Sequence, residues 1–518
     1  MVETSSKPHI EFSSWLLLII ISLAVFCVNF NTTAVTNAMS SIQNQLNLSA
    51  SAAQWTINIY LLTAASLIII GGQLGDMYGR RHLFLFGIFA FWIAAIVIAI
   101  STSAVGLLIG RLLQGIGAAL VTPSALAIVK VHFPEEHQDL AISAITGAMG
   151  LGYALGPSLG GFLTTVYSWK AIFWFMIPIL SVVAVLTPFK IKHSPRPFIG
   201  AYQTKLDMLG LLLFVFGMVP FVLGLVEGNI WGWTKFATLS LLVGGSLILI
   251  LFWLVENYTN SPLIDFTNFE KKLFVLSIAG VGNTIFSLLT ILYFFNLYTQ
   301  NSLLLNYTTF ESGLAMLPAS LTMFMISLFS NKIIRALGLR LAALFGLACM
   351  MIGFVLLSFI NIQTTYASLW PSLLFCGAGL GLGMSTFLSL GMNSLPAEKA
   401  GEASGILSTI NFLASIFSIS IGSILFSHAG RREVYKLLSS SSEISAIQRG
   451  YLDKILVDHQ HLFTELLQQL SPVKQQLVIS TLQYSALSSL HSVVIMNLRV
   501  IIIVSVLTFF LLKDPVEK

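Results

Sequence analysis

Charged residues are scarce in this sequence: Asp, Glu, Lys and Arg together make up 9% of its 518 residues. Soluble domains carry about a quarter charged residues, so this scarcity excludes a soluble globular protein. Hydrophobic residues make up 56% of the chain, and its mean hydropathy is +0.88. These values indicate an all-α polytopic membrane protein, in which every spanning helix needs about 20 apolar residues.

Cysteine is also rare. Cys27, Cys349 and Cys376 are the three cysteines, and all lie inside apolar runs. This placement excludes a disulfide framework and a cysteine-based metal cluster. The sequence also has no phosphate loop, nucleophile elbow or metal-ligand cluster, so we expect neither an enzyme nor a bound metal or cofactor.

Acidic residues are missing from the middle of the membrane: none of the 21 Asp and Glu residues falls at the centre of an expected span. Arg111 and Arg499 do lie inside spans, and an intramembrane arginine is retained mostly where it faces water, a partner or a substrate. Ser488 and Ser492 share a helical face with Arg499, which predicts a polar stripe turned toward a cavity. Two cations without an internal acid favour a ligand that carries negative charge. The alternative for Arg499 is that it bonds backbone carbonyls or Asn411.

Long apolar runs recur from Trp15 to Leu512, and we place about fourteen spanning helices among them. The first run is too long for a signal peptide, so we interpret it as a retained span. Basic residues gather in alternate loops, which predicts a cell inner-membrane protein with both termini in the cytoplasm. The same distribution argues against nucleic-acid binding, despite the net charge of +5. We expect a monomer.

An internal repeat divides the chain. GRRHLFLFG begins at Gly79, and the similar GLRLAALFG begins 259 residues later at Gly338. Transporter folds are often built from repeated halves, so a duplication is the simplest explanation. We therefore predict an N-terminal six-helix bundle over residues 1–195, a two-helix insertion over 196–270 and a C-terminal six-helix bundle over 271–518.

One substantial non-membrane segment, residues 428–485, separates the last two spans on the predicted extracytoplasmic side. Its apolar residues recur at helical spacing, and Ser471 followed by Pro472 fits an N-cap and the first helical position. The pattern predicts an extracytoplasmic helical hairpin. Such a hairpin is either a docking site for a periplasmic adaptor or a lid.

The turn between the second and third spans carries GQLGDMYGRR, with Gly72, Asp76, Gly79, Arg80 and Arg81. The glycine before the arginines permits a tight reversal, and the aspartate can pair with a nearby arginine or cap a helix. An ordinary turn with basic anchors is the alternative interpretation.

The fifth span carries GYALGPSLGG, with Gly152, Gly156, Pro157, Gly160 and Gly161. Three of these glycines stand four residues apart, so they line one helical face and let another helix approach at backbone distance. The proline adds a kink, because it removes a backbone hydrogen bond. A generic small-residue packing face is the alternative.

Together with RLLQGIGAAL in the fourth span, Arg111 to Leu120, these motifs resemble the signatures of the major facilitator superfamily. The chain is similar, over nearly its whole length, to the fourteen-span drug:proton antiporter family. The resemblance implies the major facilitator fold, in which two six-helix bundles rock around a central site. It also implies that the turn motif acts as a charge lock and that the glycine face prevents leakage.

Members of that family carry an acid near the end of the first span, and the matching residue here is Asn31. An amide cannot release a proton, so this chain cannot couple protons through that position. Glu311 and His491, near the outer ends of later spans, remain as proton-coupling candidates. The residues expected to line the substrate cavity are Asn29, Asn31, Trp55, Arg111, Gln114 and Arg499.

The leading interpretation is an alternating-access efflux transporter of small amphipathic molecules, with proton-coupled multidrug antiport implied by the resemblance. The abundant Phe and Met favour broad multidrug binding, because such side chains repack around different ligands. The alternative is an exporter of an anionic metabolite, siderophore-like or polycarboxylate, with unusual or absent proton coupling. A second alternative is a non-transporting sensor or scaffold, against which the intact motifs argue.

Overall fold

Every regular element in the described part of the chain is a helix. The computed structural model describes residues 12–190, 207–259, 262–396, 399–439 and 472–512, and these contain no strand. The predicted all-α class is therefore confirmed. Thirteen helices in these ranges are long and apolar enough to cross a membrane, and α3 adds the shorter apolar stretch Ala52–Ile68. The protein is a multi-pass membrane protein, while the count of fourteen spans stays a prediction.

The first bundle contains six long helices and one short one. They are α1 (Phe12–Asn37), the short α2 (Met39–Leu46), α3 (Ala50–Tyr78), α4 (Arg80–Ile100), α5 (Ala104–His132), α6 (Glu135–Val166) and α7 (Ala171–Lys190). Ser49 and Ser103 begin α3 and α5, because each hydroxyl accepts a backbone N–H bond from three residues ahead at 3.2 Å. Tight pairs such as α1 with α6 and α3 with α5 hold this bundle together.

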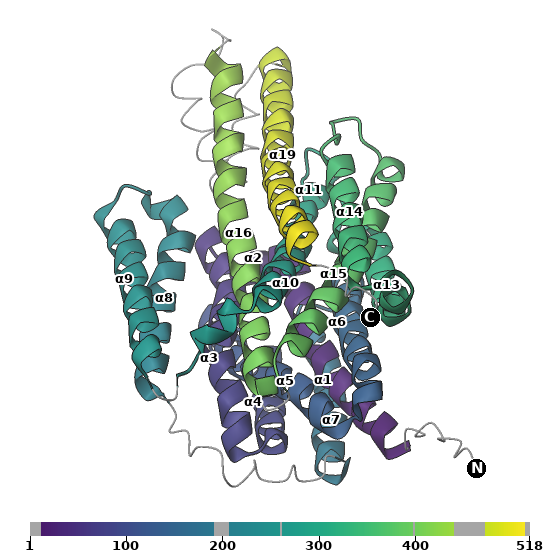
Figure 1. Ribbon diagram of the computed structural model, residues 1–518. Coiled ribbons are helices and arrows are strands. Elements are labelled where there is room, and N and C mark those ends of the chain that lie inside the picture. Colours follow the sequence, from purple (N-terminus) through teal and green to yellow (C-terminus); the bar gives the residue numbers. More distant parts are fainter. Residues whose placement is uncertain (1–11, 191–206, 260–261, 397–398, 440–471, 513–518) are drawn as a thin grey trace, which may run out of the picture.

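The insertion is a hairpin of α8 (Met208–Trp231) and α9 (Phe236–Tyr258), which stands at one side of the molecule (Figure 1). Asp207 begins the hairpin by capping α8, and Gly232 ends that helix with φ +98°. The two helices touch at backbone distance, because a Cβ on Gly245 would lie 2.7 Å from the amide nitrogen of Phe221. Most of the α9 surface remains exposed and apolar, as expected for a helix facing lipid.

The second bundle is more broken than the first. It contains η1 (Phe266–Glu270), α10 (Lys272–Thr290), η2 (Ile291–Phe295), α11 (Asn296–Gln300), α12 (Thr309–Ala315), α13 (Leu317–Leu337), α14 (Leu339–Leu357), α15 (Tyr366–Ser394), α16 (Ala400–Ser439) and α19 (Pro472–Leu511). The segment η2 is a π-helical turn between α10 and α11, and such turns often mark functional sites. The two bundles meet mainly where α3 packs on α16 and where α6 packs on α12 and α13.

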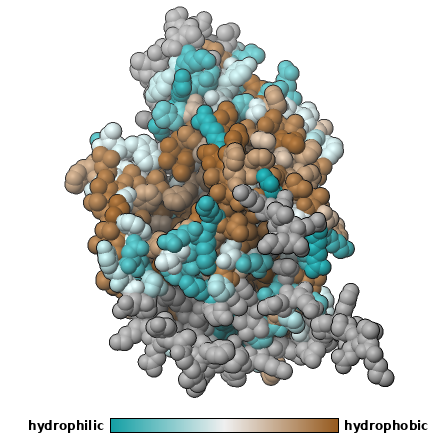
Figure 2. Space-filling model, in the orientation of Figure 1, coloured by the Kyte–Doolittle hydropathy of each residue, from teal (hydrophilic) through white to brown (hydrophobic). Residues whose placement is uncertain are grey.

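Apolar side chains cover most of the middle of the visible face, with hydrophilic residues gathered above and below (Figure 2). Many large apolar residues are exposed, including Phe86 on α4, Phe216 on α8 and Phe510 on α19. In water such a surface would be a liability, whereas lipid tails solvate it without penalty. The surface therefore agrees with membrane embedding.

The repeat seen in the sequence recurs in the packing. A Cβ on Gly117 would lie 2.9 Å from the Gly87 carbonyl oxygen, and a Cβ on Gly379 would lie 2.6 Å from that of Gly346. The turn glycine of the repeat is also special in both halves, since Gly79 has φ +94° and its counterpart Gly338 has φ +78°. The same close contacts between the same helices support a duplication.

Two arginines one repeat apart make the same bond. Arg81 Nη2 donates to the Pro188 carbonyl oxygen at 2.9 Å, at the end of α7. Arg340 Nη2 donates to the Phe509 carbonyl oxygen at 2.9 Å, at the end of α19. Carbonyls in the last turn of a helix lack an intrahelical partner, so each guanidinium satisfies one of them.

The predicted hairpin over 428–485 differs from the structure at both flanks. Residues 428–439 continue α16 to Ser439, and α19 begins at Pro472 and runs unbroken into the last span. No proline interrupts either flank within these helices, so the helical hydrogen bonds continue past the apolar stretches. Both helices rise beyond the neighbouring helix ends (Figure 1). The remaining part of the predicted hairpin, residues 440–471, lies outside the described residues.

Candidate functional site

Arg111 of α5 is completely buried, and it is the centre of the candidate site. Its Nε donates to the Thr56 carbonyl oxygen at 2.9 Å, and its Nη1 donates to Gln114 Oε1 at 3.0 Å. The guanidinium carbon lies 4.2 Å from the centre of the Tyr60 ring, in cation–π geometry. No carboxylate pairs with this guanidinium within the described ranges.

Close approach of α3 and α5 puts Arg111 in this position. A Cβ on Gly115, one turn after Arg111, would lie 2.7 Å from the Tyr60 carbonyl oxygen. Only glycine allows this backbone contact, which brings Thr56 and Tyr60 within reach of the guanidinium. Gly115 therefore positions Arg111 in the site and also lets α3 and α5 pack closely.

The first span adds polar groups beside Tyr60. Thr32 Oγ1 lies 3.3 Å from the Tyr60 hydroxyl, and Asn31 lies next to the same hydroxyl. Asn31 is fully buried, and apart from this approach to Tyr60 its amide makes no hydrogen bond within the described residues. Asn29 faces another way, because its Nδ2 donates to the Val25 carbonyl oxygen of its own helix at 2.7 Å.

Residues of the opposite bundle complete the site. The Tyr60 and Phe412 rings meet edge to face with centroids 6.1 Å apart. Tyr153 of α6 lies beside the Asn411 side chain of α16. We call Asn31, Thr32, Tyr60, Arg111, Gln114, Tyr153 and Asn411 the central polar cluster. Its position between the bundles fits a group that senses their relative motion.

Only Asn31, Arg111 and Gln114 of this cluster are among the cavity residues expected from the sequence. Thr32, Tyr60, Tyr153 and Asn411 are not, and the two tyrosines lie in apolar runs where a tyrosine gives no signal of its own. Buried tyrosine hydroxyls usually find a polar partner. Tyr60 lies one helical turn after Thr56, on the face of α3 that Arg111 approaches. Its place in the site can be inferred only when the pairing of α3 with α5 is known.

Two donors of the central polar cluster have no partner among the described residues. Arg111 Nη2 and Gln114 Nε2 are buried and make no hydrogen bond there. Leaving a buried donor unpaired costs about 1–3 kcal/mol, and more for a charged group. Both donors are therefore unpaired within the described residues.

Trp55 does not belong to this cluster. Its Nε1 donates to Glu227 Oε1 at 2.5 Å, which ties α3 to α8 of the insertion. Glu227 is buried near the end of α8. The expected cavity role of Trp55 is thus replaced by a contact between the first bundle and the insertion.

Arg499 also lies elsewhere. Its side chain is exposed on α19, on the same helical face as the exposed Ile495, Ile502 and Ile503. The predicted polar stripe toward a cavity is not found, because the buried face of α19 contains Asn497 and not Arg499. On that face Asn497 accepts from Ser287 and donates to Thr290, each at 2.6 Å. We therefore remove Arg499 from the cavity candidates.

The two proton-coupling candidates have structural partners. Glu311 is exposed and closes a capping box at the start of α12, where its Oε2 accepts from the Thr308 backbone at 2.8 Å. These bonds from Thr308 lower the pKa of Glu311. His491 Nε2 lies 2.9 Å from the Ile360 carbonyl oxygen. Neither residue contacts the central polar cluster.

The glycine motif of α6 packs against the first span as predicted for a small-residue face. A Cβ on Gly152 would lie 2.7 Å from the Phe26 carbonyl oxygen, and one on Gly156 would collide with Thr33. A Cβ on Gly160 would lie 2.6 Å from the Cβ of Ala34. Backbone-distance contact over three turns makes this pair rigid.

The end of the same motif joins the two bundles. Asn37 Nδ2 donates to the Pro157 carbonyl oxygen at 2.9 Å and to the Thr309 carbonyl oxygen of the second bundle at 3.1 Å. A Cβ on Gly161 would lie 2.7 Å from the same Thr309 oxygen. At the other end of the interface, Ser404 Oγ lies 3.5 Å from the Pro123 carbonyl oxygen. The bundles therefore touch at both ends.

The turn motif also acts through backbone groups. Gly79 supplies the positive φ of the reversal, and Arg80 Nη1 donates to the Ala127 carbonyl oxygen of α5 at 2.9 Å. Gly72 and Asp76 belong to α3, but the surroundings of Gly72 and the side chain of Asp76 lie outside the described part. The predicted charge lock at Asp76 thus stays a prediction.

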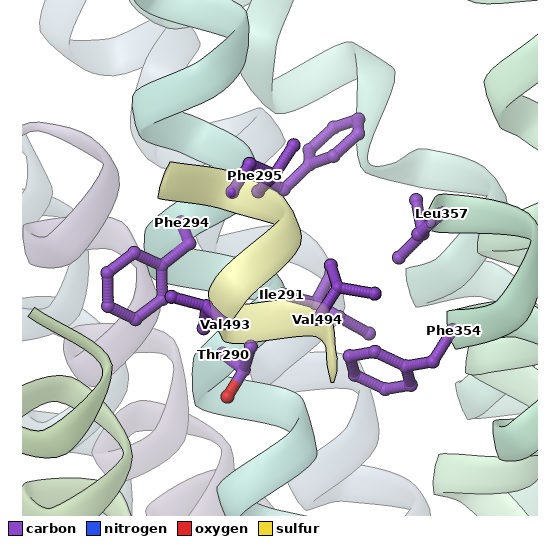
Figure 3. A pocket seen from close by; sticks show the side chains of 9 residues that line it. Thr290, Ile291, Phe294, Phe295, Phe354, Leu357, Val493 and Val494 are labelled. Carbon is purple, nitrogen blue, oxygen red and sulfur yellow. The ribbon is translucent and has the colours of Figure 1, made fainter. Parts of the chain in front are cut away.

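A second cross-bundle contact involves the π-helical turn η2. Tyr293 of this turn lies beside the side chains of Gln54 on α3 and Ser423 on α16. The adjoining cavity between η2, α14 and α19 is lined by Phe294, Phe354 and Val493, among other apolar residues (Figure 3). Its volume is about 10 Å³, room for about one water molecule, so it is no substrate pocket.

Comparisons with known proteins agree with this architecture. A family model described as "Major Facilitator Superfamily" matches residues 21–419. The chain is 30% identical over 412 residues to multidrug resistance protein Stp of Mycobacterium tuberculosis, covering 79% of this chain and 75% of the relative. It is 29% identical over 454 residues to the tetracenomycin C resistance and export protein of Streptomyces glaucescens, covering 83% and 80%. It is 29% identical over 416 residues to cephamycin export protein CmcT of Amycolatopsis lactamdurans, covering 78% and 83%.

Proposed function

Since this chain belongs to the Major Facilitator Superfamily, we propose that it is an efflux transporter that exports small amphipathic molecules by alternating access. The names of three relatives, a multidrug resistance protein and two antibiotic export proteins, support export as the direction. The membrane-spanning fold and the superfamily make an enzyme the wrong class. The polarity of the loops supports a cell inner-membrane location with both termini cytoplasmic.

The observation that carries this proposal is the central polar cluster. It lies between the bundles, where a transporter of this architecture binds its substrate. Its cation is buried without a carboxylate among the described residues, and Tyr60 and Tyr153 supply aromatic walls. An aromatic wall with few convergent polar groups suits a small amphipathic ligand.

The free donors favour a particular substrate chemistry. Arg111 Nη2 and Gln114 Nε2 both need an acceptor, and a carboxylate or similar oxyanion satisfies two such donors at once. We therefore favour substrates that carry a negative charge or a dense set of acceptors. A polycarboxylate or a siderophore-like chelator meets this description, and a purely cationic drug does not.

Hydrogen bonds join the two bundles at both ends of their interface, as alternating access requires. The Asn37 bonds hold one end shut, and the contact of Ser404 with Pro123 lies at the other. Hydrogen bonds of this kind are worth about 1 kcal/mol each, so ligand binding can compensate for their loss. Opening one end while the other remains closed is the rocking motion that the repeats allow.

A separate question is whether protons drive the export. The resemblance implies a proton antiporter, but Asn31 stands at the acid position of the first span and cannot release a proton. Glu311 caps a helix on the surface. If export is driven by protons, another group must exchange them.

Transport in sealed vesicles tests this function. We expect uptake of an amphipathic anion into inverted vesicles that contain the protein, and no uptake into matched vesicles with an Arg111→Ala variant. An imposed pH gradient, set in either direction, measures coupling. Ligand binding without any flux would contradict transport and favour a sensor, while flux of cationic dyes alone would contradict the substrate charge.

A further inference from the structure

Two acidic side chains meet at one end of the insertion. Asp207 caps α8, with its Oδ1 accepting from the Gly210 amide at 2.7 Å. Glu256 lies in the last turn of α9 and is only 2% exposed. Its Oε2 accepts from the Ile264 amide at 3.3 Å. Each carboxyl group thus has one oxygen satisfied by the backbone.

The other two oxygens face each other without a donor. Asp207 Oδ2 and Glu256 Oε1 are buried, and no N–H or O–H group of the described residues bonds to either one. Both point at the same place, because a Cβ added to Gly210 would collide with Glu256 Oε1 and lie 2.6 Å from Asp207 Oδ2. Glycine at this position leaves the space in which the two carboxyl groups meet.

Two ionised carboxylates are unstable in this arrangement. Like charges at short range in a buried site disfavour double ionisation, and one shared proton turns the repulsion into a strong hydrogen bond. We propose that Asp207 and Glu256 bind one proton between them, which makes the base of the insertion a proton-binding site. One carboxyl group then donates its O–H to the other.

The neighbouring charges do not remove the need for this proton. Lys399 lies just before α16, and its Nζ binds Asp265 Oδ2 at 2.6 Å. Glu402 at the start of α16 accepts from the Asp265 amide at 3.0 Å and from Asn268 Nδ2 at 2.7 Å. The Lys399 cation is therefore already paired with Asp265, and Glu402 adds a second acid to the same contact.

Backbone bonds connect the acid pair to the second bundle. The Ile264 amide donates to Glu256, and the next amide, that of Asp265, donates to Glu402 of α16. Loss of the shared proton would place two negative charges together and push the ends of α8 and α9 apart. The loop that carries Ile264 would pass this displacement to α16. The proposal concerns the insertion and does not depend on the nature of the exported molecule.

Infrared spectroscopy of the purified full-length protein in lipid nanodiscs tests this site directly. We expect a protonated-carboxyl band at neutral pH that disappears as the pH rises. Glu256→Gln and Asp207→Asn should each remove that band, because an amide replaces the O–H donor. Asp265→Asn is the matched control and should keep it, since Asp265 is paired with Lys399.

Stability measurements supply the second test. A proton bound in the folded state stabilises it at low pH, and this stability is lost as the pH rises through the release of the proton. The wild-type protein should therefore melt at lower temperature in alkaline buffer, while Glu256→Gln should show a flatter pH dependence. The glutamine can donate to Asp207, so we expect this variant to fold.

Three outcomes would overturn the proposal. One is a protonated-carboxyl band that survives both Glu256→Gln and Asp207→Asn. Another is the absence of such a band in the wild-type protein at every pH at which it is folded. The third is a band whose loss follows sodium concentration at fixed pH, which would assign the site to a metal cation. None of these results bears on whether the protein transports a substrate.

Discussion

Asn37 Nδ2 lies 3.1 Å from the carbonyl oxygen of Thr309, so the last residue of α1 is bonded to the opposite bundle. The same nitrogen reaches Pro157 at 2.9 Å. One amide therefore links the first span, the glycine motif of α6 and the start of α12. A side chain in this position controls whether the two bundles can separate at this end.

Replacing Asn37 by Ala should favour opening at this end. The variant loses two hydrogen bonds of about 1 kcal/mol each, which shifts an opening equilibrium by roughly tenfold or more. Labelling of a cysteine introduced at Ser158, a buried position of the same cross-bundle contact, would report the exposure. Asn257→Ala is a matched control, because Asn257 is exposed and bonds only within its own helix. Equal labelling in both variants would contradict this role for Asn37.

Gln114→Glu should weaken the preference of the central polar cluster for anions. The new carboxylate would lie at the Gln114 Oε1 position, 3.0 Å from Arg111 Nη1, and would neutralise the guanidinium. We expect transport of an anionic substrate to fall about tenfold, as for a loss of roughly 1.4 kcal/mol in binding. The control is Gln363→Glu, which makes the same change in an exposed loop. Unchanged anion transport in the Gln114 variant would exclude the cluster as the substrate site.

Arg111 and Arg499 should behave differently although both lie inside spans. Arg111→Ala removes a buried cation that contacts Thr56, Tyr60 and Gln114, so we expect transport to be lost. Arg499→Ala removes an exposed group and should leave transport within about twofold, as surface changes usually do. Initial rates in vesicles at equal protein content would measure both. A comparable loss in the two variants would return Arg499 to the transport pathway.

Gly156→Ala should destabilise the protein. The added methyl group would collide with Thr33 and lie 2.9 Å from the Ala34 amide nitrogen, and overpacking of this kind costs about 1–3 kcal/mol. Gly244→Ala is the control, because no atom lies within 4 Å of its Cβ position. It should be neutral or stabilising by up to about 1 kcal/mol through helix propensity. Thermal unfolding in detergent would compare the two variants. Equal unfolding midpoints would show that α1 and α6 can move apart without a loss of stability.

The Asp265–Lys399 ion pair should make stability depend on pH at both extremes. Burial raises the pKa of Asp265, but hydrogen bonds from Lys399 and Thr267 outweigh burial, so the net pKa is lowered. The hydrogen bond to Asp265 raises the pKa of Lys399. The contribution of the pair is thus full near neutral pH. It is lost as the pH falls through the lowered pKa of Asp265 or rises through the raised pKa of Lys399.

Asp265→Asn removes this contribution and should flatten both ends of the stability profile. Melting curves across the pH range would measure the difference. A wild-type profile that matches the variant in acid and in alkali would mean that the ion pair adds nothing, as is common for exposed pairs.

Much of the fold could be predicted because it depends on local patterns. Apolar runs, turn glycines and the repeat at Gly79 and Gly338 are all readable along the chain, and the structure confirms an all-α membrane protein. The start of α19 at Pro472 was also predicted from proline chemistry. The full length of α16 and α19 was not predicted, because apart from Pro472 no proline within their described flanks marks a helix end.

The site was harder to predict because burial depends on how helices rotate. Arg499 and Asn497 are two residues apart, and sequence spacing alone cannot tell which one faces the bundle; the structure buries Asn497 and exposes Arg499. Glu311 resembled a proton carrier by position, yet Thr308 three residues earlier makes it a cap. That capping box was readable in the sequence and could have settled the role of Glu311.

Helices α16 and α19 are 40 residues long each, which corresponds to about 60 Å at 1.5 Å per residue. The hydrocarbon core is about 30 Å thick, so roughly half of each helix extends outside it. These two helices belong to one bundle and therefore act as a lever arm fixed to it. A tilt of that bundle by about 10° would move their free ends by roughly 10 Å, which makes them a natural place to attach a reporter of the rocking motion.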